Sequence, residues 1–504
     1  MSDFEIPESW AEAAIDETAE MLSRGKSPKY STRQSDVFAI NQKCVYWDAI
    51  RIENRKEVES LWFRSVADRF KLKYGDILVN STGTGTLGRV NVWIDNNLNA
   101  VPDSHLTLWR PKLPISPFFM SSFLRSFEGQ KIIQSATSGS TNQIELSKGK
   151  FGAGKVPIPP AAEQHRIVAK IESTHSKIAA IEKAVTEAEA LLKKYRESLL
   201  AKAFRGELVP QDPNDEPASK LLERIRAERA KAIKNGEIKK SKKDELPPIS
   251  DDEIPFDIPK SWEWVRLGEI IALKHGYAFK SEHFMKSGRF TLLTPGHFFE
   301  RGGFRDQRTK TKFLDISVDD EFVLRAGDML IAMTEQAPGL LGSAAWIPDD
   351  GRLYLHNQRL GKISAIGARF MNLEYVYQYF NASYLRAAVA KSCTGSTVRH
   401  TSSERVLSVL IPLPPASEQL RIASAIQAFL EQQSQIQGKV NAQKPLLRQF
   451  SNAILAQAFS GRLVPQDPSE GTGHELLAQI LNEKQSAATA KETKKTKAAK
   501  APRK

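Results

Sequence analysis

The chain has 504 residues, which at about 150 residues per domain predicts roughly three domains. With 41% hydrophobic and 26% charged residues, its composition is that of a folded protein. Apolar runs reach only about eight residues, which excludes a membrane-spanning helix. Two cysteines exclude a disulfide framework and a four-cysteine zinc site. The acidic start at Ser2–Glu5 has no apolar signal region, so we expect a cytoplasmic protein.

The net charge of +13 lies in two short tracts. Residues 220–243 hold ten Lys/Arg and three Glu, and residues 485–504 hold seven Lys/Arg and one Glu. The other 460 residues are neutral overall. Two interpretations stay open: the tracts are flexible solvated segments, or they are basic arms that contact a polyanion.

The first 155 residues predict a mixed α+β block. Residues 76–80 indicate a short buried strand, and the alternation of Val90, Val92 and Ile94 with polar or aromatic residues indicates another. Residues 328–332 predict the corresponding strand later in the chain. Aromatic and apolar residues at helical spacing are typical of a core helix near the end of each block: Phe119, Phe123, Leu124, Phe127, Tyr375, Tyr379 and Phe380.

Two glycine-rich segments imitate nucleotide-binding motifs. Residues 83–88 match G-x-G-x-x-G, but an alternating strand follows where a phosphate-binding helix is required, so we expect a hairpin. Residues 149–156 come within one residue of a P-loop, but Val156 replaces the magnesium-binding hydroxyl and Pro157 blocks the following helix. No metal-protease or nucleophile motif is found in the sequence, and we expect no catalytic centre and no bound metal.

A long helix is predicted after residue 160, because apolar residues recur there at alternating steps of three and four. The same pattern returns after residue 415, with Pro445 expected to kink that helix. Helices of about 40 residues span roughly 60 Å. Neither can bury its apolar stripe alone, so we expect them to pack together; the alternative is that each lies on its own domain. The predicted seam consists of Ile167, Ile171, Ile178, Ile181 and Leu192 with Ile422, Ile426, Phe429, Ile436 and Leu447.

The chain is an internal repeat. Residues 156–160, Val-Pro-Ile-Pro-Pro, recur as Ile-Pro-Leu-Pro-Pro 255 residues later, and the segment 203–213 recurs at the same offset as 458–468. Phe-Glu-Ile-Pro-Glu-Ser-Trp at 4–10 recurs as Phe-Asp-Ile-Pro-Lys-Ser-Trp at 256–262. Each half therefore has a variable block of about 155 residues and a matched block of about 75. Different variable blocks on matched frames indicate two ligand specificities and one shared docking role.

The order of these motifs resembles the specificity subunit of type I restriction-modification enzymes. In each half, Pro-x-x-Trp opens the variable block, Pro-x-Pro-Pro-x-x-Glu-Gln leads into the long helix, and Ala-Phe-x-Gly-x-Leu ends it. The resemblance implies an α+β fold with two globular target-recognition domains separated by two long antiparallel coiled-coil helices, related by a pseudo-twofold axis. It also implies a non-catalytic subunit that reads a bipartite, asymmetric DNA site. The implied partners are double-stranded DNA, two adenine methyltransferase subunits on the helices and two restriction/translocase subunits.

On this reading the boundaries are as follows: 1–155 target-recognition domain 1, 156–235 helical region 1, 236–255 a basic and proline-containing linker, 256–410 target-recognition domain 2, 411–485 helical region 2 and 486–504 a disordered basic tail. The chain itself is expected to bind no cofactor. S-adenosylmethionine, ATP and Mg²⁺ are implied for the partner subunits.

Candidate DNA contacts are basic residues between glycine-bearing turns, for phosphates, and polar loop residues, for base edges. The segments 138–142 and 394–399, which share Gly-Ser-Thr, are candidates for phosphate contacts through hydroxyls and backbone N–H groups, or for turn geometry. In the first block these are Arg24, Lys26, Lys29, Asn80, Thr82, Thr84, Ser140, Thr141 and Asn142. In the second they are Arg301, Arg305, Arg308, Lys310, Lys312, Gln336, Asn357, Gln358, Arg359, Ser396, Thr397 and Arg399. Two alternatives to a DNA reader stay open: a coiled-coil scaffold that binds only proteins, and a standalone enzyme that uses the glycine-rich loops.

Overall fold

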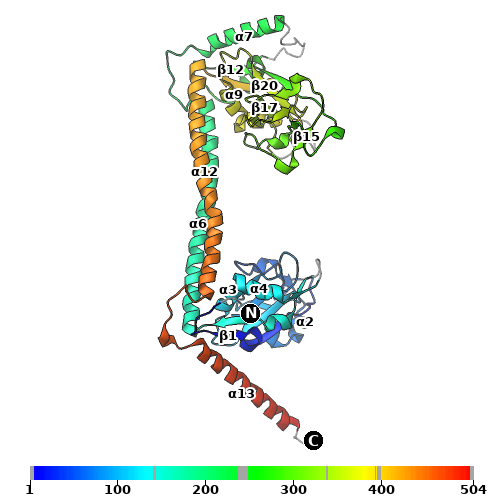
Figure 1. Cartoon of the computed structure of the whole chain (residues 1–504), viewed down its shortest axis with the longest axis vertical. Coiled ribbons are helices and arrows are strands. Elements are labelled where there is room, and N and C mark those ends of the chain that lie inside the picture. Colours follow the sequence, from blue (N-terminus) through cyan, green and yellow to red (C-terminus); the bar gives the residue numbers. More distant parts are fainter. Residues whose placement is uncertain are drawn as a thin grey trace. The chain divides into compact units, whose positions relative to one another are not determined.

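The computed structural model describes residues 5–139, 144–235, 248–335, 339–391, 393 and 399–499, with side chains described up to residue 486. The chain forms two compact units. Unit 1 consists of residues 1–185 and 442–504, and unit 2 of residues 186–441. Each unit holds one variable block together with parts of both long helices (Figure 1).

The variable block of unit 1 is built on a four-stranded antiparallel sheet in the order β2-β8-β5-β6. A second sheet, β4-β3-β7, pairs β3 with β7 in parallel. The strands are β2 (Ala19–Arg24), β3 (Val37–Ile40), β4 (Lys56–Glu57), β5 (Ile77–Asn80), β6 (Val90–Val92), β7 (Asn99–Pro102) and β8 (Leu106–Pro111). Short elements are α1 (Ile15–Thr18), α2 (Ser60–Ser65), α5 (Lys148–Gly152), β9 (Thr137–Ser138) and β10 (Glu145–Leu146).

Unit 2 repeats this plan with β13-β20-β17-β18 and a second sheet β15-β14-β19-β16. Its strands are β13 (Ile271–His275), β14 (Phe290–Leu292), β15 (Lys312–Leu314), β16 (Val323–Leu324), β17 (Met329–Ala332), β18 (Ala344–Trp346), β19 (Leu353–Leu355) and β20 (Leu360–Ala365). Short helices are α8 (Leu267–Ile270) and α11 (Ser403–Leu407). The strands predicted at 76–80 and 328–332 are therefore confirmed as β5 and β17, which are buried throughout.

A short antiparallel ladder ties the start of each block to its end. In unit 1, β1 (Ala11–Ala14) pairs with β11 (Lys155–Ile158), and in unit 2, β12 (Glu263–Arg266) pairs with β21 (Leu410–Leu413). The long helices α6 (Ala161–Phe204) and α12 (Ala416–Phe459) begin directly after β11 and β21. Prolines between each strand and helix set this junction, because they fit the first helical turn but end a strand ladder.

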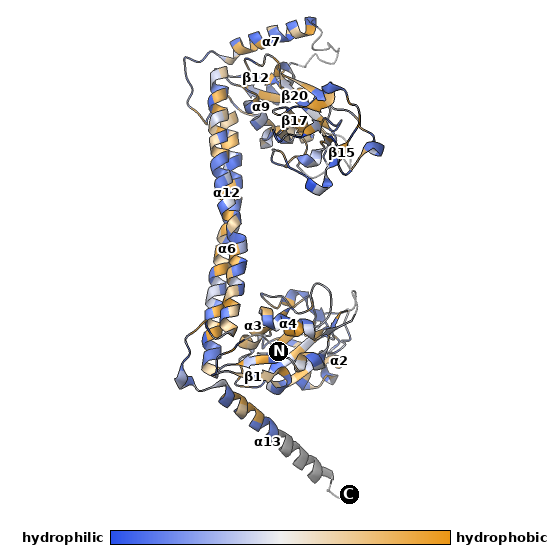
Figure 2. Ribbon diagram, viewed as in Figure 1, coloured by the Kyte–Doolittle hydropathy of each residue, from blue (hydrophilic) through white to orange (hydrophobic). Residues whose placement is uncertain are grey.

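The two long helices run antiparallel where they meet. In unit 2, Gln437 Nε2 lies 3.4 Å from Glu189 Oε1, Gln433 Nε2 donates to the Leu192 carbonyl, and Phe429 packs on Tyr195. Residue numbers therefore rise along α6 as they fall along the facing part of α12. Hydrophobic and hydrophilic residues are mixed along both helices, whereas β17 and β20 are mainly hydrophobic (Figure 2).

The predicted seam is confirmed for part of its residues only. Six of the ten residues are less than 9% exposed: Ile167, Ile171, Ile178, Ile422, Ile426 and Leu447. Leu192 and Phe429 are half-buried. Ile181 and Ile436, however, are 45% and 48% exposed, so they do not belong to a buried seam, and their role in docking a partner stays a prediction. A pair of helices covers only a narrow stripe of each partner, and residues at the margin of that stripe stay open to solvent.

The end of each long helix also packs on the variable block of the other half of the repeat, which neither alternative for the helices predicted. In unit 1, α3 (Pro117–Arg125), which α4 (Phe127–Ser135) follows, brings Phe119 and Phe123 against Phe459 at the end of α12. In unit 2, α9 (Leu373–Phe380) brings Tyr375 and Tyr379 against Phe204 at the end of α6, beside α10 (Ser383–Lys391). The predicted aromatic cores are therefore confirmed.

Four expectations need correction or comment. Phe127 begins α4 and is 74% exposed, because the helix is interrupted at Ser126 and the new helix directs that ring outward. Ile94 is 64% exposed and Trp93 buried, since β6 ends at Val92. Helix α12 stays continuous through Pro445, and the expected kink stays a prediction. The backbone of residues 486–499 is helical rather than disordered, because Ala and Lys favour a helix.

Two further helices complete the units. α7 (Ala218–Lys234) packs on unit 2 through Leu221 and Ile225, and α13 (Gly473–Ala499) packs on unit 1 through Leu476 and Ile480. Single 3₁₀ turns occur at Ile52–Asn54, Asp68–Phe70, Asp251–Glu253, Ser281–His283, Pro295–His297, Arg308–Lys310, Asp320–Phe322 and Pro468–Glu470. Among the described residues, no helix has the length and apolar character needed to cross a bilayer.

Candidate nucleic-acid interface

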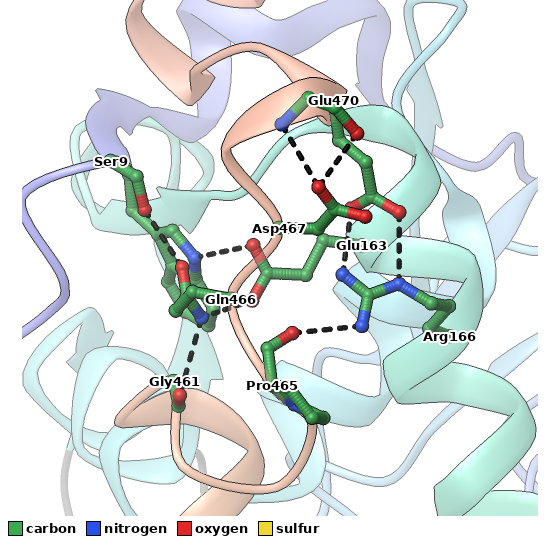
Figure 3. A network of polar contacts seen from close by, with 10 residues as sticks. Ser9, Glu163, Arg166, Gly461, Pro465, Gln466, Asp467 and Glu470 are labelled. Carbon is green, nitrogen blue, oxygen red and sulfur yellow. Dashed lines mark hydrogen bonds and ion pairs between the residues drawn. The ribbon is translucent and has the colours of Figure 1, made fainter.

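A buried polar network, which we call the cap, fixes each variable block to the long helices. In unit 1 the carboxylate of Glu163 accepts a hydrogen bond from Trp10 Nε1 at 3.0 Å and another from Gln466 Nε2. Ser9 Oγ donates to the side-chain oxygen Oε1 of Gln466, and Gln466 Nε2 also donates to the backbone carbonyl of Gly461 (Figure 3). Burial raises the pKa of Glu163, partly offset by these donors. Three segments remote in the sequence therefore meet at one carboxylate.

Unit 2 holds the same network with the corresponding residues. Glu418 accepts from Trp262 Nε1 at 2.9 Å and from Gln211 Nε2, and Ser261 Oγ donates to Gln211. Gln211 also donates to the Gly206 carbonyl. The segment that follows α12 thus caps the first block, and the segment that follows α6 caps the second. These contacts explain physically why the motifs recur at a fixed offset.

Backbone recognition adds to each cap. Gln164 accepts from the Ser116 N–H and donates to the Pro159 carbonyl, and Gln419 does the same with the Asn372 N–H and the Pro414 carbonyl. Both glutamines are fully buried. The side-chain amide is suited to this task because it carries a donor and an acceptor side by side.

An ion pair closes each cap on its outer side. Arg166 donates from two nitrogens to the Glu470 carboxylate, at 3.0 and 2.7 Å, and Arg421 donates to Asp215 at 2.6 Å. The guanidinium of Arg421 lowers the pKa of Asp215. Bidentate geometry of this kind fixes orientation as well as contributing energy.

The exposed edge of each block carries the candidate reading residues on a shared backbone frame. Lys26 bridges Asp103 in unit 1 as Tyr277 bridges Asn357 in unit 2. Thr82 bridges Glu145 as Thr334 bridges His400. We call these positions the reading edge.

The side chains on this shared frame differ in chemistry. The backbone N–H of His105 donates to the carboxylate of Asp103, two residues earlier, at 2.9 Å. The backbone N–H of Arg359 donates in the same way to the side-chain oxygen of Asn357, at 3.0 Å. Exposed side chains at the edge are Lys26, His105 and Glu145 in unit 1 and Tyr277, Arg359 and His400 in unit 2. Matched backbones with different hydrogen-bonding groups are what two different base sequences require.

The predicted DNA contacts of the first block are partly at this edge. Arg24 pairs with Glu145, Lys26 lies 3.9 Å over the Phe70 ring, and Thr82 contacts His105 Nδ1 at 2.9 Å. Lys29 and Thr84 are exposed, the latter on the hairpin between β5 and β6 that replaces a nucleotide loop.

In the second block, the predicted contacts include a run of cations between β14 and β15. Arg305 pairs with Glu300, Arg308 has a positive φ of 47°, and Lys312 lies 4.6 Å over the Phe284 ring. Arg301 and Lys310 are exposed, as are Gln358 and Arg359. Arg399 pairs with Glu335.

Two predicted base readers are structural residues instead. Asn80 is fully buried and donates to the Gln42 carbonyl, and Asn357 is 9% exposed and holds the turn that presents Arg359. Asparagine at the end of a strand bonds its own loop backbone before it reaches solvent. Six candidates lie outside the described residues: Ser140, Thr141, Asn142, Gln336, Ser396 and Thr397. His105, Glu145, Tyr277 and His400 were not predicted, because only the pairing of distant segments brings them to the edge.

Apolar side chains stay exposed along the long helices. On α6 these are Ile181, Leu191 and Tyr195, and on α12 they are Leu420, Ile436, Leu446 and Phe450, each at least 45% exposed. The two helices therefore leave part of their apolar surface uncovered in this chain.

The family follows from comparison with known proteins. The model of the type I restriction modification DNA specificity domain matches residues 7–190 and again residues 259–443, once for each half of the repeat. The chain belongs to the type I restriction-modification DNA specificity family. The predicted family and fold class are thereby confirmed. Each match begins at the Pro-x-x-Trp motif of a cap and ends inside a long helix.

Relatives within this specificity family support the assignment. The chain is 28% identical over 388 residues to the specificity subunit of the type I restriction enzyme EcoAI from Escherichia coli, covering 68% of this chain and 63% of that protein. It is 31% identical over 280 residues to the EcoEI specificity subunit, also from Escherichia coli, covering 54% of this chain and 46% of that protein. The aligned region therefore spans about half to two-thirds of these relatives.

Solved structures show the same fold. A chain from a study of assembly and conformational transition of the type I R-M system aligns over 91% of this chain and 100% of that chain, with TM-score 0.65 and 17% identity. The HsdS subunit from Thermoanaerobacter tengcongensis aligns over 92% of this chain and 99% of that one, with TM-score 0.55 and 17% identity.

Proposed function

We propose that this chain is the non-catalytic DNA-specificity subunit of a type I restriction-modification complex and reads a bipartite, asymmetric site. The observation that carries the proposal is the reading edge: one backbone frame occurs twice and bears different exposed groups. In this proposal the first block reads one half of the site through Lys26, His105 and Glu145. The second block reads the other half through Tyr277, Arg359 and His400.

The proposed docking surface for the partners is the exposed apolar set on α6 and α12. Two matched caps beside matched helix segments suit two copies of one methyltransferase subunit, since identical partners need equivalent sites. Restriction/translocase subunits would join through that core. S-adenosylmethionine, ATP and Mg²⁺ belong in this proposal to those subunits, which perform the chemistry in the cytoplasm.

A protein-only scaffold is the second candidate, favoured by the exposed apolar residues along the helices. It predicts that the assembled complex shows no salt-dependent DNA binding and selects no DNA sequence. A standalone enzyme has less support, because the glycine-rich segment at 83–88 forms a hairpin between two strands.

The test is selection from a random DNA library by the chain co-expressed with its methyltransferase. Two short fixed sequences at constant spacing are expected. His105→Ala should relax specificity in one half only, and Arg359→Ala in the other, each by about 1–3 kcal/mol at the contacted base. Arg369→Ala is the control, because this exposed arginine pairs with Glu228 on α7, away from the reading edge. An intact complex without an enriched motif supports the scaffold instead.

A further inference from the structure

A cavity of about 240 Å³ in unit 2 gathers four cations. It lies where the C-terminal part of α6 meets the turn between α9 and α10. Lys193 and Arg196 enter from α6, Arg386 from α10, and Arg301 from the loop after β14. The acidic residues of the lining are Glu197 and Glu300, which leaves a net charge of +2.

Arg196 and Arg386 are incompletely bonded in this cavity. Arg196 donates from Nη2 to the Arg301 carbonyl at 2.8 Å, and Arg386 donates from Nη2 to the Gly339 carbonyl. The Nε of each arginine is buried and has no hydrogen-bond partner in the described part of the chain. An unmet buried guanidinium donor is costly, so the site favours an additional acceptor.

Charge in the cavity is also unbalanced. Glu300 already pairs with Arg305, and Glu335 with Arg399. Burial lowers the pKa of Arg386 to about 10, and repulsion from Arg196 contributes in the same direction. Burial likewise lowers the pKa of Arg196. Glu335 and Glu300 act against the shift at Arg386, but each of these carboxylates already pairs with another arginine.

Unit 1 has no such pair of arginines at the corresponding positions. At the repeat offsets of 256 and 255, the counterparts of Arg386 and Arg196 are Gln130 and Ser451. Gln130 donates to the Gly88 carbonyl at 3.1 Å, and Ser451 contacts His175. Uncharged side chains therefore occupy the two corresponding positions in unit 1 of the same chain.

We propose that Arg196 and Arg386 together bind one backbone phosphate of the DNA half-site read by the second block. Arginine pairs suit a phosphate, because each guanidinium offers parallel N–H donors to its oxygens. Arg301, the first residue of the cationic run, lines the cavity, and so does Gly339, which follows Thr334 of the reading edge by five residues in the sequence. Since α6 supplies one arginine, this phosphate would link the helix directly to the DNA. The inference rests on the proposed DNA-reading function.

The test replaces single phosphates with neutral methylphosphonates along a selected target bound by the assembled complex. One position in the second half-site should weaken wild-type binding about tenfold, because one charge-assisted contact is lost. In the paired variant Arg196→Ser and Arg386→Gln, which copies unit 1, the same replacement should change affinity less than twofold. That variant should also reduce the salt slope of binding by about one.

Control variants keep the outcomes distinct. Arg369→Gln removes an exposed charge from the same unit and should keep the phosphate response. Arg386→Lys retains the charge and serves if the paired variant does not fold; it should weaken the response without abolishing it. Equal phosphate profiles for wild type and variant overturn the inference, as does a variant whose assembly with the methyltransferase, rather than DNA affinity, is reduced. If wild type itself selects no sequence, the proposed function fails instead.

Discussion

The hydrogen bond from Trp10 to Glu163 gives a quantitative test of the cap. Trp10→Phe removes the indole N–H and leaves one carboxylate oxygen of a residue that is 1% exposed without its donor. A hydrogen bond to a charged group contributes about 1.5–3 kcal/mol. The smaller ring leaves space that costs about 1 kcal/mol more. We therefore expect the free energy of unfolding of unit 1 to fall by about 2.5–4 kcal/mol.

A double-mutant cycle separates these two contributions. In a Glu163→Leu background no acceptor remains, so Trp10→Phe should cost only the packing contribution of about 1 kcal/mol. The coupling energy between the two sites should then be about 1.5–3 kcal/mol. The measurement is hydrogen exchange at increasing denaturant, resolved by segment, because two units need not unfold in one transition.

The second cap provides the matched control for the cycle. Trp262 and Glu418 are joined at 2.9 Å, so Trp262→Phe with Glu418→Leu should give a similar coupling in unit 2 and leave unit 1 unchanged. A coupling below about 0.5 kcal/mol in either cap would refute the claim that the indole donor satisfies a buried carboxylate.

Three further predictions concern titration, burial and backbone conformation. Because burial raises the pKa of Glu163, protonation of this residue favours the folded state. The stability of wild type relative to Glu163→Gln should therefore fall as pH rises from about 4 to 7. Hydrogen exchange of unit 1 in denaturant at several pH values measures this, and an opposite slope contradicts it. Ile171→Ala should cost about 2–4 kcal/mol, whereas Ile181→Ala should cost under about 1 kcal/mol, since these residues are 3% and 45% exposed; equal losses in the same exchange experiment would contradict the burial. Gly461→Ala should destabilise the protein by more than about 1 kcal/mol, because φ is +68° and a Cβ would lie 2.1 Å from a proline ring. Gly438→Ala lies in open space on α12 and should stabilise it by about 0.5–1 kcal/mol. Thermal unfolding compares the two variants, and an unchanged stability of Gly461→Ala would contradict the close approach.

The spacing of apolar residues and glycines within short segments predicted the individual strands, the hairpin and the long helices. The strands β5 and β17, the hairpin at 83–88 and both long helices follow from alternation, glycine spacing and heptad spacing. The depth of burial at Ile181 and Ile436 did not follow, because heptad spacing reports which face a residue takes and not how far the partner helix extends over it.

The sequence predicted the candidate site only where several basic residues stand close together in the chain. Arg301 and its neighbours stand out as a basic run, and the structure places Arg301 beside the arginine cavity. Arg196 is one charge among many on a helix, and Arg386 is similar. Their meeting depends on how α6 packs on α10, which no single segment encodes. Asn80 has the residue type of a base reader, but its place at the end of β5 commits its amide to the Gln42 backbone.

The division of the caps has a consequence for the order in which the protein matures during synthesis. Unit 2 is one continuous stretch, whereas unit 1 needs residues from both ends of the chain. Gln466 is 303 residues after Glu163, which at typical translation rates is roughly 15–60 s. The block made first must therefore wait on the ribosome with Phe119 and Phe123 uncovered until Phe459 emerges, and the block made second is completed before it. Ribosome-bound chains in which residue 441 has left the exit tunnel and Phe459 has not should accordingly protect unit 2 from protease while leaving the first block sensitive.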